Sequence, residues 1–311
     1  MNVSEKAKER FCKDCNIPIH LFKEPYFSNR MDLYDKFYNT KEKYDIFLNE
    51  LQKYSNEQEY FEEYNRVKDD AINFIKNSEG YKKFNEEDMN KYRVIYAKDL
   101  PGKDIFKPSF DGRKFLSIDM KKANFSALYY YDPSMFGMAD SWVEFISQFT
   151  SNIHIIGSKY IRQVILGNCN PKRHITFEKY IMDGLFFTLS SYLPIDKVVF
   201  FSNDEIVYDV TDIYYNTTIL EELQKVWYSR HIPVSIEVFT LHKIHATDGY
   251  CKEIYNKNGE VSIEFKCLNN YMLPFAIRYV LGQEVTEEDK MFYHEGLLSK
   301  FIDVPKIHID F

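Results

Sequence analysis

The sequence predicts an α+β fold in which helices pack on one face of a β-sheet. Two observations lead to this class. A strand-like segment at 114–119 is followed by helical segments and then by a short hairpin at 197–210. An amphipathic helix at 218–229 and a strand with period-two alternation at 234–241 complete the series. Strand, helices, hairpin, helix and strand in this order are typical of a sheet with its helices on one side.

The first hundred residues predict a helical module. Apolar residues recur there at three- and four-residue steps, the spacing of one helix face. They are Leu33, Phe37, Tyr44, Phe47, Leu48 and Leu51. Proline and glycine interrupt the chain at 100–102 and again at 106–112, as at a module boundary. We therefore expect a helical N-terminal module over 1–100 and a second module that begins at Arg113.

The second module, 113–245, is expected to hold a sheet with inserted helices. The segment 124–129 is apolar enough to turn inward, and Asp132-Pro133 ends it because proline disfavours helix in the preceding residue. Helical patterns then follow at 141–148, 158–166 and 177–192.

The last segment, 250–311, is expected to be a small α+β extension. Asn258-Gly259 is a tight-turn signal inside 251–266, so this stretch predicts a hairpin. Two helices are expected after it, at 271–281 and 286–301. The second begins with Thr286 as N-cap and has acidic residues in its first turn, both of which favour a helix start.

Composition restricts the class of protein. With 311 residues, 45% hydrophobic and 28% charged, the chain can bury a sizeable core. We assign the high aromatic content of 17% first to core and surface, and second to platforms for stacking bases. The net charge of −7 argues against a protein that binds nucleic acid over its whole surface. Lysines and arginines within 113–179 still allow a local basic groove.

The sequence predicts a soluble cytoplasmic protein with no membrane partner. No apolar run is long enough to cross a bilayer, and the N-terminus lacks the apolar stretch of a signal peptide. Five cysteines, an odd number, fit a reducing compartment better than a disulfide framework. Cys12 and Cys15 with His20 begin like a zinc motif but lack a second pair of ligands at usable spacing, so we expect no zinc site.

The segment 200–210, FFSNDEIVYDV, carries the strongest functional signal. It places Asp204 and Glu205 at a hairpin tip between two apolar strands. A second aspartate, Asp119, ends the strand-like segment KFLSID. Carboxylates held close together on rigid strands repel unless a divalent cation lies between them. We therefore expect Asp119 and Asp204 to bind Mg²⁺ or Mn²⁺, with Glu205 as an auxiliary acid. The alternative, that these are ordinary turn and strand-end acids, stays open.

The order of three motifs resembles the palm and fingers of family A polymerases, which include bacterial DNA polymerase I and the single-subunit phage RNA polymerases. In that family a first aspartate ends a palm strand, a fingers helix carries a basic residue five positions before a glycine, and a hairpin presents His-Asp-Glu. These features fall on Asp119, on Arg162 with Gly167, and on Asp204-Glu205. The resemblance covers residues 113–210 and implies a polymerase-like palm, with the N-terminal helices as a thumb.

The sequence departs from the family at three positions. Asn124 stands where the DNA polymerases have a glutamate that helps to exclude ribose, so the choice of sugar is open. Asn170-Pro171 replaces the Tyr-Gly after the fingers helix, which puts templated copying in question. Asn203 replaces the histidine before the hairpin aspartate.

The resemblance implies a metal-dependent nucleotidyltransferase that adds nucleotides to a 3′ end of DNA or RNA. It would act as a minimal polymerase or a terminal transferase, with a nucleoside triphosphate as substrate. Residues expected to contact the nucleotide are Lys159, Arg162, Asn124, Lys172 and Arg173. Lys159 and Arg162 are three apart, on one helix face, and are suited to the β- and γ-phosphates.

Two other functions stay open. An RNase H-like nuclease would use Asp119 with further acids among Asp183, Asp196, Asp204 and Glu205. A non-catalytic protein, such as a replication factor of a virus or mobile element, would use the same surface to bind a partner.

Overall fold

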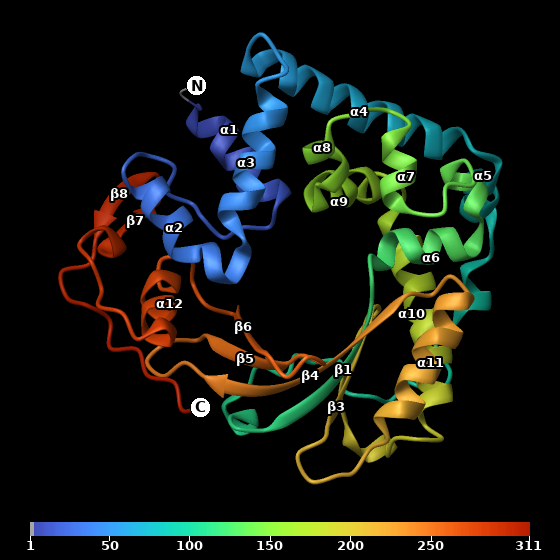
Figure 1. Ribbon diagram of the computed structural model, residues 1–311. Helices are drawn as coiled ribbons and strands as arrows, with labels where there is room; N and C mark the ends of the chain where they lie inside the picture. The colour runs from blue at the N-terminus through green and yellow to red at the C-terminus, as the bar shows by residue number, and fades with distance from the viewer. Residues whose placement is uncertain (1–2) are drawn as a thin grey trace.

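The computed structural model describes residues 3–311 and shows a mixed α+β protein. Within those residues there are 12 α-helices, a six-stranded antiparallel sheet and a separate two-stranded hairpin. The elements follow a ring, with the main sheet at the bottom of the view in Figure 1 and helices completing the circle. The predicted α+β class is therefore confirmed.

The N-terminal helices form one arc of the ring. They are α1 (Glu5–Asp14), α2 (Tyr26–Tyr38), α3 (Thr40–Leu51), α4 (Glu57–Asn77) and α5 (Glu79–Glu86). Asn39 separates α2 from α3 in a left-handed conformation, which asparagine tolerates better than most residues. Side chains of Ser4, Asn56 and Ser78 cap α1, α4 and α5. The helical prediction for this region is confirmed.

The main sheet has the order β2-β3-β1-β4-β5-β6, and every neighbouring pair is antiparallel. Its strands are β1 (Lys114–Met120), β2 (Val198–Phe201), β3 (Glu205–Asp209), β4 (Val234–Lys243), β5 (Tyr250–Tyr255) and β6 (Val261–Lys266). The first four strands and their helices follow a β-α-β-β-α-β course, the split arrangement. The predicted hairpin at 251–266 is confirmed, and it continues this sheet through β5.

Six helices are inserted between β1 and β4. They are α6 (Ala123–Tyr131), α7 (Trp142–Ser147), α8 (Ile153–Gly157), α9 (Lys159–Gly167), α10 (Pro171–Leu189) and α11 (Thr217–Ser229). Helix α10 begins six residues earlier than predicted because Pro171 fits the first helical position. Helix α8 was not predicted. Short 3₁₀ turns lie at Met89–Tyr92, Pro108–Phe110, Pro133–Phe136, Ile195–Lys197 and Glu288–Lys290.

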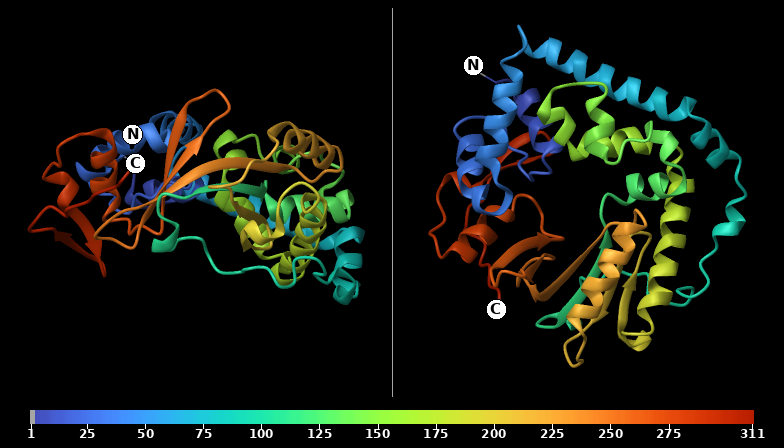
Figure 2. Two further views of the ribbon diagram at one scale, coloured as in Figure 1. Left: turned by 90° about the horizontal axis from the view of Figure 1, so that it is seen from below. Right: turned by 45° about the vertical axis from the view of Figure 1, so that its right-hand side comes forward.

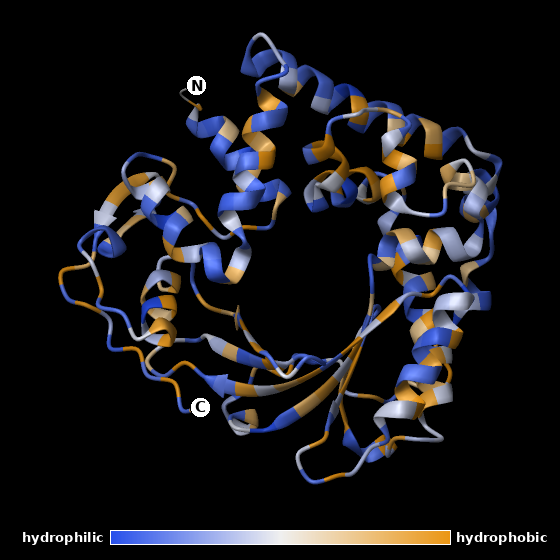
Figure 3. Ribbon diagram, viewed as in Figure 1, coloured by the Kyte–Doolittle hydropathy of each residue, from blue (hydrophilic) through white to orange (hydrophobic). Residues whose placement is uncertain are grey.

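Strand alternation gives the sheet two different faces. Leu116, Ile118 and Met120 belong to the large core that also holds buried residues of α6 and α10. Figures 1 and 2 show α6, α10 and α11 on the same side of the ring. In Figure 3, hydrophobic residues are prominent in α8 and α9, while much of α4 is hydrophilic. The other sheet face carries Phe115, Ser117 and Asp119, which alternate with the core residues.

The C-terminal region differs from the prediction. Helix α12 (Leu273–Leu281) is present, but the predicted helix at 286–301 is wrong. That stretch holds the hairpin of β7 (Met291–His294) and β8 (Leu297–Lys300). Glu295 and Gly296 both have positive φ, as the type I′ form of a two-residue hairpin turn requires. The residue read as a first-turn acid, Asp289, is instead buried, and its carboxylate accepts a hydrogen bond from the Thr286 N–H.

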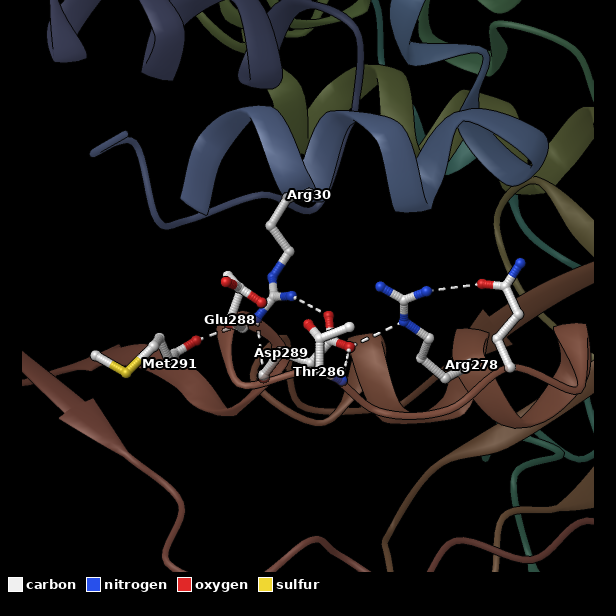
Figure 4. Close-up of polar contacts among 7 residues, drawn as sticks. Arg30, Arg278, Thr286, Glu288, Asp289 and Met291 are labelled. Atoms are coloured by element: carbon white, nitrogen blue, oxygen red, sulfur yellow. Dashed lines mark hydrogen bonds and ion pairs between the residues drawn. The ribbon is translucent and has the colours of Figure 1, made fainter. Parts of the chain in front are cut away.

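A buried ion-pair cluster joins the two ends of the chain. Arg30 of α2 donates to the carboxylate of Asp289 at 2.8 Å, and Arg278 of α12 donates to its other oxygen at 2.9 Å. Arg30 also donates to the backbone carbonyls of Glu288, Asp289 and Met291. Figure 4 shows Arg30 reaching from its helix to the turn that holds Asp289. This cluster fixes the N-terminal helices against the C-terminal region.

Candidate functional site

Strand pairing brings the predicted acidic residues together. Asp119 at the end of β1 lies opposite Glu205 on β3 and Ser235 on β4. Asp204 lies in the turn before β3, and its backbone carbonyl accepts a hydrogen bond of 2.7 Å from the Met120 N–H. The Ser202 hydroxyl donates to the Asp204 carboxylate at 2.9 Å. Asp119 and Glu205, predicted from two distant segments, are thus neighbours on adjacent strands, with Asp204 in the adjoining turn.

A fourth acid, Glu237, was missed by sequence reasoning. It lies on β4 opposite Ser117 and on the same sheet face as Asp119. Its carboxylate forms an ion pair with Lys252 of β5. The period-two alternation of β4 puts Ser235 and Glu237 on one side of the strand. That alternation was the available signal, but sequence alone did not show that β4 pairs with β1.

Burial and neighbouring acidic residues raise the pKa values of Asp119 and Glu205. Burial raises the pKa of Asp119 to about 6, and the neighbouring charges of Glu205, Asp204 and Glu237 add to this effect. Burial likewise raises the pKa of Glu205, although a hydrogen bond of 2.5 Å from the Ser117 hydroxyl and the charge of Lys252 oppose the shift. Neighbouring carboxylates that oppose one another's ionisation in this way favour the binding of a proton or a cation.

The acidic face borders a cavity of about 410 Å³, within the range of small-ligand sites. Lys159 lines it from α9, on the far arc of the ring, while Lys252 and Lys266 line it from β5 and β6. The remaining lining residues are Asp104, Ile105, Phe106, Ser117, Asp119, Phe200, Glu205, Ser235, Glu237, Phe239 and Glu264. The cavity therefore brings acids, lysines and apolar surface into one space.

The acids have the right chemistry for a hard divalent cation but are not arranged around one. Within residues 3–311, no group of three or more Asp, Glu, His or Cys side chains has the geometry of a metal site. Asp119 accepts only a long contact of 3.5 Å, from Ser235, among the described side chains. Its oxygens are therefore free to act as ligands, and carboxylate oxygens are what Mg²⁺ and Mn²⁺ prefer. Asp119, Asp204 and Glu205 therefore supply the type of donor that such a cation takes, and Asp119 and Glu205, but not Asp204, line the cavity.

The five residues predicted to contact a nucleotide are in different surroundings. Lys159 is exposed and lines the acidic cavity. Arg162, on the next turn of α9, is half-buried near Lys122, and burial lowers its pKa. Its Nε atom is buried with no hydrogen-bond partner within the described chain. An unpartnered buried donor of this kind is available to an anion.

Like Arg162, the other three predicted residues do not line the cavity. Arg173 donates to the backbone carbonyls of Phe84 and Glu87, which fixes α10 to the end of α5. Lys172 is exposed in the first turn of α10. Asn124 is half-buried in the first turn of α6, and its side chain accepts from the backbone of Phe125. The structure brings only Lys159 of the five to the acids.

A buried polar network supports the hairpin tip. The Asn203 amide donates to the Glu178 carboxylate at 2.5 Å. Glu178 lies on α10, is 2% exposed, and is also bound by His174 at 3.0 Å. The other ring nitrogen of His174 lies 3.3 Å from the Leu166 carbonyl near the end of α9. The turn next to Asp204 is thereby tied to the helix that carries Lys159.

No protein-family model matches this chain, and no curated protein matches it significantly. Within residues 3–311, no helix is both long enough and apolar enough to cross a bilayer.

Proposed function

We propose that the protein is a metal-dependent nucleotidyltransferase that adds nucleotides to a nucleic-acid 3′ end. The observation that carries this proposal is the direct pairing of Asp119 with Glu205, with Asp204 in the adjoining turn. Acids on two adjacent antiparallel strands, next to a lysine-lined cavity, suit two-metal phosphoryl chemistry. The β-α-β-β-α-β course supports a polymerase-like palm by analogy of fold.

The chain's own side chains have separate roles in this reaction. Asp119 and Asp204 would hold Mg²⁺ or Mn²⁺, which when bound activates a 3′-hydroxyl and neutralises charge on a triphosphate. Glu205, held by the Ser117 hydroxyl, would be an auxiliary acid beside Asp119. Lys159 would contact the triphosphate from the opposite side of the cavity. The raised pKa of Asp119 means that binding of a proton or a cation is favoured over leaving the neighbouring carboxylates ionised and unneutralised.

The nuclease alternative has weaker support. Asp183, one of its expected acids, accepts hydrogen bonds from the backbone of Ile95, Tyr96 and Ala97. It therefore fixes the segment before the sheet rather than joining Asp119. Asp196 lies in a 3₁₀ turn before β2, and unlike Asp119 and Glu205 it does not line the acidic cavity.

Nucleotide incorporation tests the proposal. Each of the eight common nucleoside triphosphates would be supplied with Mg²⁺ or Mn²⁺ to labelled DNA and RNA primers, with and without a template overhang. We expect extension by the native protein, loss of extension in Asp119→Asn and Asp204→Asn, and full activity in the control Asp212→Asn, whose side chain lies in an exposed loop. Shortening of the primer would indicate a nuclease. No change in the primer under any condition would leave only the binding-protein alternative.

A further inference from the structure

A second cavity, of about 800 Å³, adjoins the acidic cavity and has no role in the reaction described above. It lies between the N-terminal helices, α9 and β6. Glu264 and Lys266 of β6 line both cavities, so the two are neighbours along that strand. Because β6 pairs only with β5, its other edge is not covered by a strand.

The lining of this cavity is locally cationic in a chain of net charge −7. Four lysines line it against two glutamates. Glu9 pairs with Lys13 at 2.6 Å and Glu264 with Lys266 at 2.8 Å, which leaves the charges of two lysines uncompensated. Neither Lys36 nor Lys43 forms an ion pair with a described carboxylate. A cationic hollow of this kind concentrates anionic ligands.

Lys43 is held in place for such a ligand. Its Nζ donates to the Tyr38 carbonyl at 2.6 Å, and an ammonium group has two further donors to offer. Lys36 is exposed on α2, two residues before Tyr38. The two cations therefore stand on either side of the junction between α2 and α3.

Aromatic rings line the same cavity. Phe22, Phe37, Tyr38, Tyr160 and Phe265 all contribute and all are half-buried. The rings of Phe37 and Phe265 contact each other with centroids 5.6 Å apart, which joins α2 to β6. Rings that keep one part accessible next to lysines are the combination that binds unpaired bases, through stacking and phosphate contacts.

We propose that this cavity binds a nucleotidyl unit, a planar base with its phosphate, of a single-stranded nucleic acid. The inference rests on the proposed function, because a strand held here lies next to the acidic cavity where its end would react. A free nucleotide carries the same two chemical groups, so the test includes both sources. The site is separate from Asp119 and Asp204, neither of which lines it.

Binding without metal tests the inference apart from catalysis. Fluorescein-labelled hexathymidylate and hexauridylate would be titrated by fluorescence anisotropy in EDTA, with ATP as an unlabelled competitor. The test variant is Lys36→Glu with Lys43→Glu. The matched control is Lys76→Glu with Lys82→Glu, which changes the charge equally at two exposed positions outside both cavities.

We expect binding at least tenfold weaker in the test variant and within twofold of the native protein in the control. Each lost phosphate contact lowers the slope of log affinity against log salt by about 0.7 on single strands, so two lost contacts lower it by about 1.4. Lys36→Gln with Lys43→Gln serves as a second variant if the glutamates disturb folding, which a melting curve detects.

The outcomes separate this inference from the proposed function. If ATP displaces the labelled oligonucleotide from the native protein but not from the test variant, the ligand is a free nucleotide. If ATP does not displace it from the native protein, the ligand is the strand. Equal weakening in test and control variants, or no binding by the native protein, would overturn the inference. A protein that adds no nucleotides yet loses binding only in the test variant would contradict the proposed function and leave the binding site intact.

Discussion

Replacing Asp289 by alanine should destabilise the whole protein, because this carboxylate joins the two ends of the ring. Asp289 is 2% exposed and lies between Arg30, 6% exposed, and Arg278. Removing it leaves the Arg30 guanidinium buried without its carboxylate. The backbone N–H of Thr286 also loses its acceptor.

The expected size of the effect follows from these contacts. Breaking a buried ion pair by removing one partner costs about 3 to 5 kcal/mol. Arg30 keeps its hydrogen bonds to three backbone carbonyls, so we expect the lower end, about 3 kcal/mol. An unfolding entropy of about 2.1 cal/mol/K per residue gives about 650 cal/mol/K for a chain of this length, and hence a fall in Tm of about 5 °C.

Differential scanning calorimetry and urea unfolding measure both quantities. Glu284→Ala, at an exposed position on the loop after α12, is the control and should leave Tm within 1 °C of the native value, roughly the effect of a surface substitution. Replacing Arg30 by methionine together with Asp289→Leu should recover part of the loss, because it removes the unpaired charge. A fall in Tm of less than about 1.5 °C for Asp289→Ala, equivalent to about 1 kcal/mol, would refute the assignment of this cluster as a structural tie.

Three further predictions concern the candidate site. The raised pKa of Asp119, about 6, makes the folded state bind this proton more tightly than the unfolded chain, so its contribution to stability falls as pH rises from about 4 to 6. Asp119→Asn should therefore stabilise the metal-free protein above pH 6, by about 1 to 2 kcal/mol after allowance for partial exposure; calorimetry showing no gain at pH 8 would contradict this. Lys159→Ala should raise the KM for the nucleoside triphosphate about tenfold, the value of one charge-assisted contact, whereas Lys172→Ala, outside the cavity, should leave it unchanged; equal effects would remove Lys159 from the site. Glu178→Ala should lower kcat at least about tenfold and speed amide exchange around Asn203, because the buried His174 ring and the half-buried Asn203 amide lose their shared acceptor; unchanged exchange there would show that the hairpin tip holds its position alone.

Local sequence patterns predicted most of the secondary structure. The hairpin at 197–210, the alternation of β4 and the Asn258-Gly259 turn are each set by residues close in sequence, and each is present. The helix prediction for 286–301 rested on the same kind of local pattern, and it was wrong. Its acidic residues and Thr286 resemble a helix start locally. The Asp289 carboxylate, however, accepts a hydrogen bond from Arg30, which lies more than 250 residues earlier in the chain. A propensity argument cannot see such a partner.

The candidate site shows the same division. Asp119, Asp204 and Glu205 were identifiable because strand-end and turn positions fix where acids stand. Glu237, Lys252 and the two adjoining cavities were not identifiable, because they depend on β4 and β5 joining the sheet beside β1. Arg173 looked equivalent to Lys159 in sequence, and only packing of α10 against α5 separates them.

By itself, the sequence determined the fold class, the placement of acids at two strand ends and the helical character of the first hundred residues, since these follow from periodicity, turn chemistry and caps. Tertiary structure alone decided the order of the six strands, the closure of the ring through Asp289 and the approach of Lys159 to the acids. The physical reason is the difference in sequence separation over which the two kinds of interaction act. Backbone preferences act over a few residues, whereas strand pairing, buried ion pairs and cavities join residues that the sequence keeps far apart.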